Sequence, residues 1–251
     1  MDYLKVLDQL EPDNTGNVLG QISDTYLVAR NRVAVSNEVD AIHRATILDH
    51  PVVKNPLYIA LAERKITKEN FQKFSPQYLE ASTKYFFTDI VPAARRLHVS
   101  EDWQKYTQHI LEEESTPMPH YKMFEKLVIS CGGRISEPTD AAKNYAAAMM
   151  NGYTADSPFA AGYALGVEVQ AGYEIALLYY GLSPVFPVQV KRSDFFRVHL
   201  GDGQEDEHAE ASVALIELSC KSEADFLRAK EGFIQFCDDA NSFMTSMYTM
   251  Q

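Results

Sequence analysis

The chain has 251 residues, 46% of them hydrophobic, so it can bury a full core and is not a disordered segment. Its net charge of −12 argues against nucleic acid or an anionic membrane as the main partner. Three well-separated cysteines without a CxxC pair indicate neither a disulfide scaffold nor a thiolate zinc site. Because signal-peptide and membrane-span patterns are also missing, we expect a soluble cytoplasmic protein.

The first half of the chain predicts helices separated by prolines. Residues 1–20 are mixed in character and are expected to form an N-terminal extension. Helices are then predicted to start near Ser23 or Asp24, Asn55, Thr67 and Ser100. In the helix after Thr67, apolar residues step by three and four, which indicates a buried face. Prolines should bend or end these helices at positions 51, 76, 92, 117 and 119.

The second half of the chain is also helical in pattern. Helices are predicted over about 138–151, from Pro158 to Gly181, from near Ser193 and after Ser222. The segment from Pro158 is mostly apolar, so it should be the central helix. The only strand-like run, residues 184–190, contains two prolines. We therefore predict an all-α fold, a single domain over residues 1–251 with about seven to nine helices.

Residues 195–212 are rich in side chains that can bind metals. His199, His208 and five carboxylates lie within twelve residues of one another. Mixed imidazole and carboxylate ligands suit iron, manganese or zinc. Glu205 and His208 are three residues apart and so share a helix face, as in di-iron helical proteins. The alternative is a solvated helix start, in which Asp202 is the N-cap and Glu205 its capping-box partner.

Glu168 lies in the middle of the most apolar predicted helix. An ionised carboxylate there must be paired or bind a metal, because burial without a partner costs several kcal/mol. The alternative is a narrow polar stripe that Glu168 shares with Tyr163 or Gln170.

Glu113 and His120 are seven residues apart, which on one continuous helix turns both to the same face. An exposed turn is the alternative, because two prolines lie between them. Glu80 is a weak further candidate, since an ion pair with Lys84 one turn later would explain it. The remaining histidines show no ligand spacing and are expected to be surface or packing residues: His43, His50, His98 and His109.

Taken in order, these motifs resemble the haem-oxygenase-like di-iron oxidases. The matching features are Glu113-x6-His120, Glu168 in an apolar helix that ends in Gly-Leu, and FFRVH followed by ExxH. Residues 55–81 are also similar to this superfamily, which includes the TenA and PqqC proteins. The resemblance covers most of residues 50–215. It implies a haem-oxygenase-like helical bundle with two Fe(II) per chain, O₂ as co-substrate, and the dimeric habit of the superfamily.

The resemblance implies a specific set of metal ligands. Carried over to this sequence, they are Glu113, His120, Glu168, His199 and His208, with Glu80 as the match to a further carboxylate of some members. The family's last helix usually reads His-x3-Asp-x2-His, whereas His199 and His208 are nine residues apart. Counting back from His208 gives Glu205 as the acid between them, and Asp202 is the acid nearest to His199.

Family members resembling this chain oxidise amino acids, fatty acids or, in the chlamydial death-domain-associated protein, form p-aminobenzoate. The resemblance therefore implies an Fe(II)- and O₂-dependent oxidoreductase acting on a small carboxylate, first among these a free amino acid, by C–C cleavage, desaturation or N-oxygenation. Arg95, Arg96 or Arg197 could bind a carboxylate with two parallel hydrogen bonds. Alternatives are a fatty-acid decarboxylase, a synthase that consumes its own tyrosine, a manganese–iron enzyme, a metal-free TenA- or PqqC-like protein, and a helical interaction protein.

Overall fold

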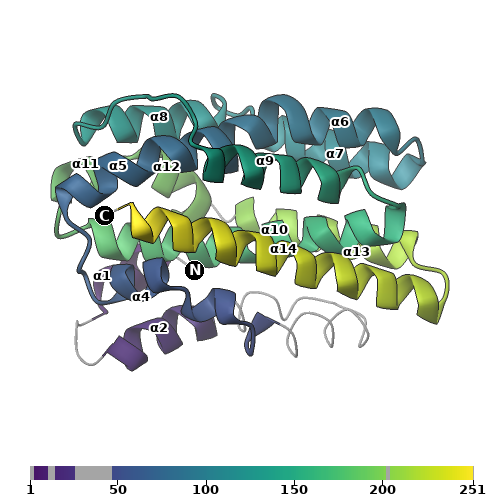
Figure 1. Ribbon diagram of the computed structural model, residues 1–251, viewed down its shortest axis with the longest axis horizontal. Coiled ribbons are helices and arrows are strands. Elements are labelled where there is room, and N and C mark those ends of the chain that lie inside the picture. Colours follow the sequence, from purple (N-terminus) through teal and green to yellow (C-terminus); the bar gives the residue numbers. More distant parts are fainter. Residues whose placement is uncertain (1–2, 11–14, 26–46, 202–203, 251) are drawn as a thin grey trace.

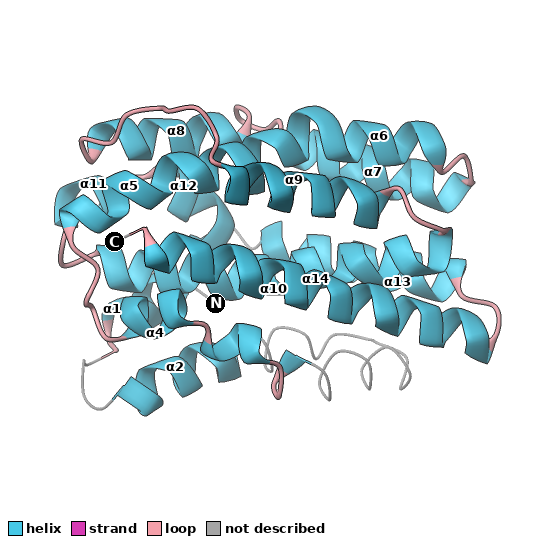
Figure 2. Cartoon of the chain, viewed as in Figure 1, coloured by secondary structure: helices cyan, strands magenta, loops and turns pink. Residues whose placement is uncertain are grey.

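The computed structural model describes residues 3–10, 15–25, 47–201 and 204–250, and every regular element within those ranges is helical (Figures 1 and 2). This confirms the predicted all-α class. The helix expected to start at Ser23 or Asp24 is wrong in its start, because Ser23 is the last residue of a helix that begins at Thr15. The rest of that expected helix falls mostly at residues 26–46 and lies outside the described residues. Within the described ranges, no helix is long and apolar enough to cross a membrane.

The helices lie in three layers (Figure 1). The middle layer contains α10 (Ser157–Leu182), α13 (Gln204–Ser219) and α14 (Glu223–Thr249). The upper layer in this view contains α5 (Lys68–Tyr78), α6 (Val91–Leu97), α7 (Glu101–Glu113), α8 (His120–Ser130) and α9 (Asp140–Tyr153). The lower layer contains α1 (Tyr3–Asp8), α2 (Thr15–Ser23) and α4 (Pro56–Ala62). Short segments connect them: η3 (Pro51–Lys54), η4 (Leu79–Lys84), η5 (Phe86–Ile90), α11 (Pro187–Lys191), α12 (Asp194–Phe196) and η6 (Arg197–Gly201).

The predicted helix starts depend on side-chain caps. Thr67 accepts a hydrogen bond from the N–H of Asn70, whose side chain accepts one in return, which completes a capping box at α5. Ser100 caps α7 and Ser222 caps α14, and each serine hydroxyl accepts a hydrogen bond from the backbone N–H three residues later. These starts confirm the expectations drawn from the sequence.

The helices are more numerous than the expected seven to nine. Helices α1 and α2 form where an N-terminal extension was expected, α11 forms in the strand-like run, and several predicted helices are divided, among them the one after Ser100 into α7 and α8. The helix after Thr67 contains Pro76 and continues as two π-helical segments, η4 and η5, before α6. The helix expected near Ser193 is divided into α12, the π-helical segment η6, and α13. Segments of this kind inside a helix often occur at functional sites.

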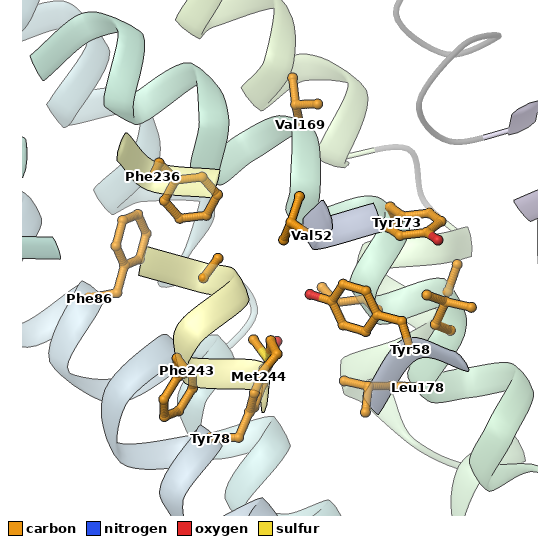
Figure 3. Close-up of a cluster of buried hydrophobic side chains, with 14 of the residues drawn as sticks. Val52, Tyr58, Tyr78, Phe86, Val169, Tyr173, Leu178, Phe236, Phe243 and Met244 are labelled. Carbon is orange, nitrogen blue, oxygen red and sulfur yellow. The ribbon is translucent and has the colours of Figure 1, made fainter. Parts of the chain in front are cut away.

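The core is built around α10, which is buried along almost its whole length, as its composition predicted. Gly162 and Gly232 allow α10 and α14 to cross closely: a Cβ at Gly162 would lie 1.8 Å from the carbonyl oxygen of Ala229. Aromatic and aliphatic side chains of both helices fill the space around them, with Phe236 and Phe243 from α14 and Tyr173 and Leu178 from α10 (Figure 3). This packing fixes the position of every side chain that α10 presents to its neighbours.

Candidate metal centre

Three side chains from three segments meet beneath the junction of α7 and α8. Glu114, His120 and His199 each offer one ligand atom, and these atoms all lie within 4.8 Å of one another. Glu114 ends α7, His120 begins α8, and His199 lies within η6. Both histidines are buried, at 2% and 5% exposed. One carboxylate and two imidazoles form a donor set that non-haem iron uses.

The turn between α7 and α8 brings Glu114 to His120. The N–H of His120 donates to the backbone oxygen of Glu114 at 2.9 Å, and Nδ1 of His120 lies 3.3 Å from Oε2 of the Glu114 carboxylate. Since α7 ends before Pro117, the seven-residue spacing does not place Glu113 and His120 on one continuous helix. Glu114, one residue further along, takes the place beside His120 that the sequence suggested for Glu113.

Backbone carbonyl groups orient both imidazoles. Nδ1 of His199 lies 2.7 Å from the backbone oxygen of Phe195, and Nε2 of His120 lies 3.2 Å from that of Thr116. A carbonyl oxygen only accepts, so these nitrogens donate. The other nitrogen of His199 then keeps a lone pair, and the other nitrogen of His120 faces the Glu114 carboxylate. Hydrogen bonds of this kind orient metal-binding histidines. The two ring centroids are 4.7 Å apart.

The protonation states of the cluster suit metal binding. Burial, together with the charge of His120, lowers the pKa of His199 to about 4, so its imidazole is neutral at physiological pH. Burial alone would raise the pKa of Glu114, but the hydrogen bond from His120 and the charges of His199 and His208 bring it below its usual value. The cluster therefore holds an ionised carboxylate and a neutral imidazole, which are the forms that bind metal cations.

A second pair of ligand-type side chains is formed by Glu168 and His208. Nδ1 of His208 lies 3.5 Å from Oε2 of Glu168, and both residues are buried, at 2% and 5% exposed. The hydroxyl of Tyr106 donates to Oε1 of Glu168 at 3.2 Å. Tyr163 and Gln170, the alternative neighbours of Glu168, instead bond Asp239 and Tyr58. Glu168 thus faces α7 and α13 and not a separate polar stripe.

The two groups lie on elements that pack against one another. Helix α13, which carries His208, packs against α7, which ends beside Glu114, and against η6, which carries His199. Together they present two carboxylates and three imidazoles from α7, α8, α10, η6 and α13. This arrangement fits two divalent transition-metal ions of the iron or manganese type.

The other predicted ligands have different positions. Glu80 pairs with Lys84 at 2.9 Å through both carboxylate oxygens, which is the ion pair that the sequence offered as its alternative. Glu113 is the last residue of α7, half-buried, and is not a member of the Glu114 cluster. Asp202 and the side chain of Glu205 lie outside the described part of the chain.

Three of the remaining histidines make the packing contacts expected of them, and His43 lies outside the described residues. His98 stacks on Trp103 and bonds the backbone oxygen of Tyr153, and His50 caps η3. The ring of His109 packs edge-on against that of His208, with centroids 5.7 Å apart and ring planes at 89°. His109 lies one helical turn before Glu113, so the sequence already places it near the candidate ligands.

Solved structures with the same architecture support the expected fold. Two crystal structures of a CADD-like protein of unknown function from Nostoc punctiforme PCC 73102 are 15% and 17% identical to this chain, with TM-scores of 0.59 and 0.60. They cover 92% and 94% of this chain and 97% and 94% of their own. A domain of unknown function with a heme oxygenase-like fold from Shewanella denitrificans OS217 is 14% identical, has a TM-score of 0.64, and covers 94% of this chain and 92% of its own.

A scan against protein-family models finds no match, and a search of curated proteins finds none either. The likeness to the solved structures therefore shows the fold: the chain is an all-α bundle with the haem-oxygenase-like architecture that the sequence motifs indicated.

Proposed function

We propose that the chain is an O₂-activating non-haem di-iron oxidase or oxygenase whose substrate is a small carboxylate. The substrate that we place first is a free amino acid. The observation that carries the proposal is the convergence of Glu114, His120 and His199 beside the buried Glu168–His208 pair. Buried ionisable groups are rare unless they are paired or bind a metal. Two imidazoles and one carboxylate are also the donor set of O₂-using iron enzymes.

In this proposal Glu114, His120 and His199 hold one iron, and Glu168 and His208 hold the second. Glu205 or Asp202 remains the proposed acid between the two histidines of the last motif, and Glu113 lies beside Glu114 as a further carboxylate. Two bound irons would supply the binding and reduction of O₂.

The chain itself orients the ligands and excludes water. The carbonyl groups of Phe195 and Thr116 fix the two imidazoles, and Tyr106 fixes one oxygen of Glu168 so that the other faces His208. Burial of the whole group strengthens each electrostatic interaction within it.

One groove offers basic side chains to an anionic substrate. Lys191, Arg192 and Arg197 line a cavity of about 430 Å³ together with Asp8 and apolar side chains. Lys191 lies 4.0 Å from Asp8, and Arg197 bonds Asp194, which is outside this lining, at 3.0 Å. Guanidinium groups bind carboxylates well, and Arg197 belongs to η6, the segment of His199, so a substrate carboxylate there would compete with Asp194.

The test is O₂ consumption by protein loaded anaerobically with Fe(II), measured with a panel of amino acids and fatty acids and followed by mass spectrometry of the products. We expect one compound class to accelerate O₂ use and to be converted. The His120→Gln variant should lose this activity. If iron-loaded protein consumes no O₂ with any compound, the proposal is wrong.

A second candidate is a self-sacrificing synthase that consumes one of its own tyrosines. One observation favours it: the hydroxyl of Tyr106 contacts Glu168 directly. Intact-protein mass spectrometry after O₂ exposure without substrate separates the two. An unchanged mass supports the oxidase, and a mass loss that Tyr106→Phe abolishes supports the synthase.

A further inference from the structure

We propose that His109 supplies the third protein ligand at the metal position formed by Glu168 and His208. This inference rests on the proposed function, since it concerns the second of two metals. It assigns a residue of α7 to the centre that neither the motif spacing nor the resemblance indicated.

The two metal positions differ in the number of ligand-type side chains that they hold. The Glu114 position has one carboxylate and two imidazoles within ligand distance of one another. Among the described side chains, the Glu168 position has one carboxylate and one imidazole in direct contact. Adding His109 would give both positions two histidines and one carboxylate, a set that binds non-haem Fe(II). No choice of ligand atoms brings His109, Glu168 and His208 all within 4.8 Å of one another, so metal binding at this position would have to draw the His109 ring inward.

The spacing of the His109 and His208 rings suits two imidazoles that share one metal ion. With metal–nitrogen bonds of about 2.1 Å, two imidazoles on one metal place their ring centroids roughly 4.5 to 6.5 Å apart. The His109 and His208 rings are 5.7 Å apart, within this range. His120 and His199, which share the first position, are 4.7 Å apart, also within it.

Helix α7 turns His109 to the same side as Tyr106. Tyr106 and His109 are three residues apart and so lie on neighbouring positions of one helix face. The Tyr106 hydroxyl already bonds Glu168, so the same face of α7 is directed at this carboxylate. Helix α7 packs against α13, which carries His208, so the face is held in place on both sides.

The experiment counts metals and measures their affinities. Wild-type protein, His109→Ala and His50→Ala are titrated anaerobically with Fe(II), and bound iron is quantified after gel filtration. His50 is the matched control, because it caps η3 and contacts Asp238. Circular dichroism confirms that each variant is folded. The His109→Ala titration is repeated with added imidazole, which can replace a missing ligand but not a packing contact.

We expect wild type and His50→Ala to bind two irons per chain. His109→Ala should bind one with unchanged affinity and the second at least ~10-fold more weakly, and imidazole should restore the second. Two irons at wild-type affinity in His109→Ala would overturn the inference, as would a loss that imidazole does not restore. If wild-type protein binds no iron, the proposed function itself fails, and that outcome is distinct from a failure of His109 alone.

Discussion

At the scale of single residues, the site depends on which atom of each side chain is left available. His120 and His199 each donate from one ring nitrogen to a backbone carbonyl of their own, so the other nitrogen of each ring faces the cluster. The sequence identified His120, His199, His208 and Glu168 as candidates because their residue types and burial are unusual. The resemblance implied Glu113 as the carboxylate, with an exposed turn left open as the alternative to a continuous helix, whereas the α7–α8 turn places Glu114 beside His120.

Adjacent glutamates provide a direct test of this difference. We expect Glu114→Gln to weaken metal binding at least ~10-fold, because it removes a carboxylate in contact with His120. Glu113→Gln, the matched control, should change the affinity much less. Isothermal titration with Mn(II), which does not react with O₂ on this time scale, measures both. The reverse order of effects would restore Glu113 as the ligand.

Tyr106 should act as a positioning residue for Glu168. Removing its hydroxyl in Tyr106→Phe leaves Oε1 of Glu168 without this donor, so we expect metal affinity at the Glu168 position to fall roughly 10-fold. Tyr145→Phe is the control, because Tyr145 stacks on Phe243 at the α9–α14 contact. Equal affinities in the two variants would show that the Tyr106 bond does not orient Glu168.

At the scale of helices, local signals predicted several starts and stops. The caps at Thr67, Ser100 and Ser222 and the break at Pro117 follow from side-chain and backbone chemistry within a few residues. The π-helical segments η4, η5 and η6 could not be predicted this way, because no local preference marks them and tertiary packing selects them.

The close crossing of α10 and α14 is essential for stability. We expect Gly162→Ala to lower the free energy of unfolding by at least ~2 kcal/mol, because its methyl group would meet backbone that cannot move away. Gly20→Ala in α2 should be neutral or stabilising, since nothing lies within 4 Å of the added carbon. Urea unfolding of both variants measures this. If Gly162→Ala kept the free energy of unfolding of the wild-type protein, the close crossing of α10 and α14 would be contradicted.

At the scale of the whole molecule, α10 presents two polar groups to two sides of the core. Glu168 faces the candidate metal centre, whereas Glu174 is bound by Tyr58, Tyr78 and Gln170. The sequence indicated that α10 is central and singled out Glu168, but it gave no sign of the second buried acid, Glu174, whose partners depend on how α4 and α5 pack against α10.

Burial raises the pKa of Glu174 above its usual value, despite the hydrogen bonds that lower it. A raised pKa in the folded state favours the protonated acid, so this stabilisation is complete below the unfolded pKa of about 4.3. This stabilisation is lost as the pH rises through the pKa that Glu174 has in the folded state. We therefore expect Glu174→Gln, which stays neutral, to lose less stability than wild type between pH 5 and pH 9, as measured by urea unfolding. Parallel pH profiles would contradict this.

The most direct test of the central claim is an anomalous difference map, recorded at the iron absorption edge, from crystals loaded anaerobically with Fe(II). We predict two peaks in one buried compartment. One should lie among Glu114, His120 and His199, and the other between Glu168 and His208. Loaded crystals with no peak in this compartment, or with iron only at the surface, would contradict the assignment of these residues as a di-iron centre.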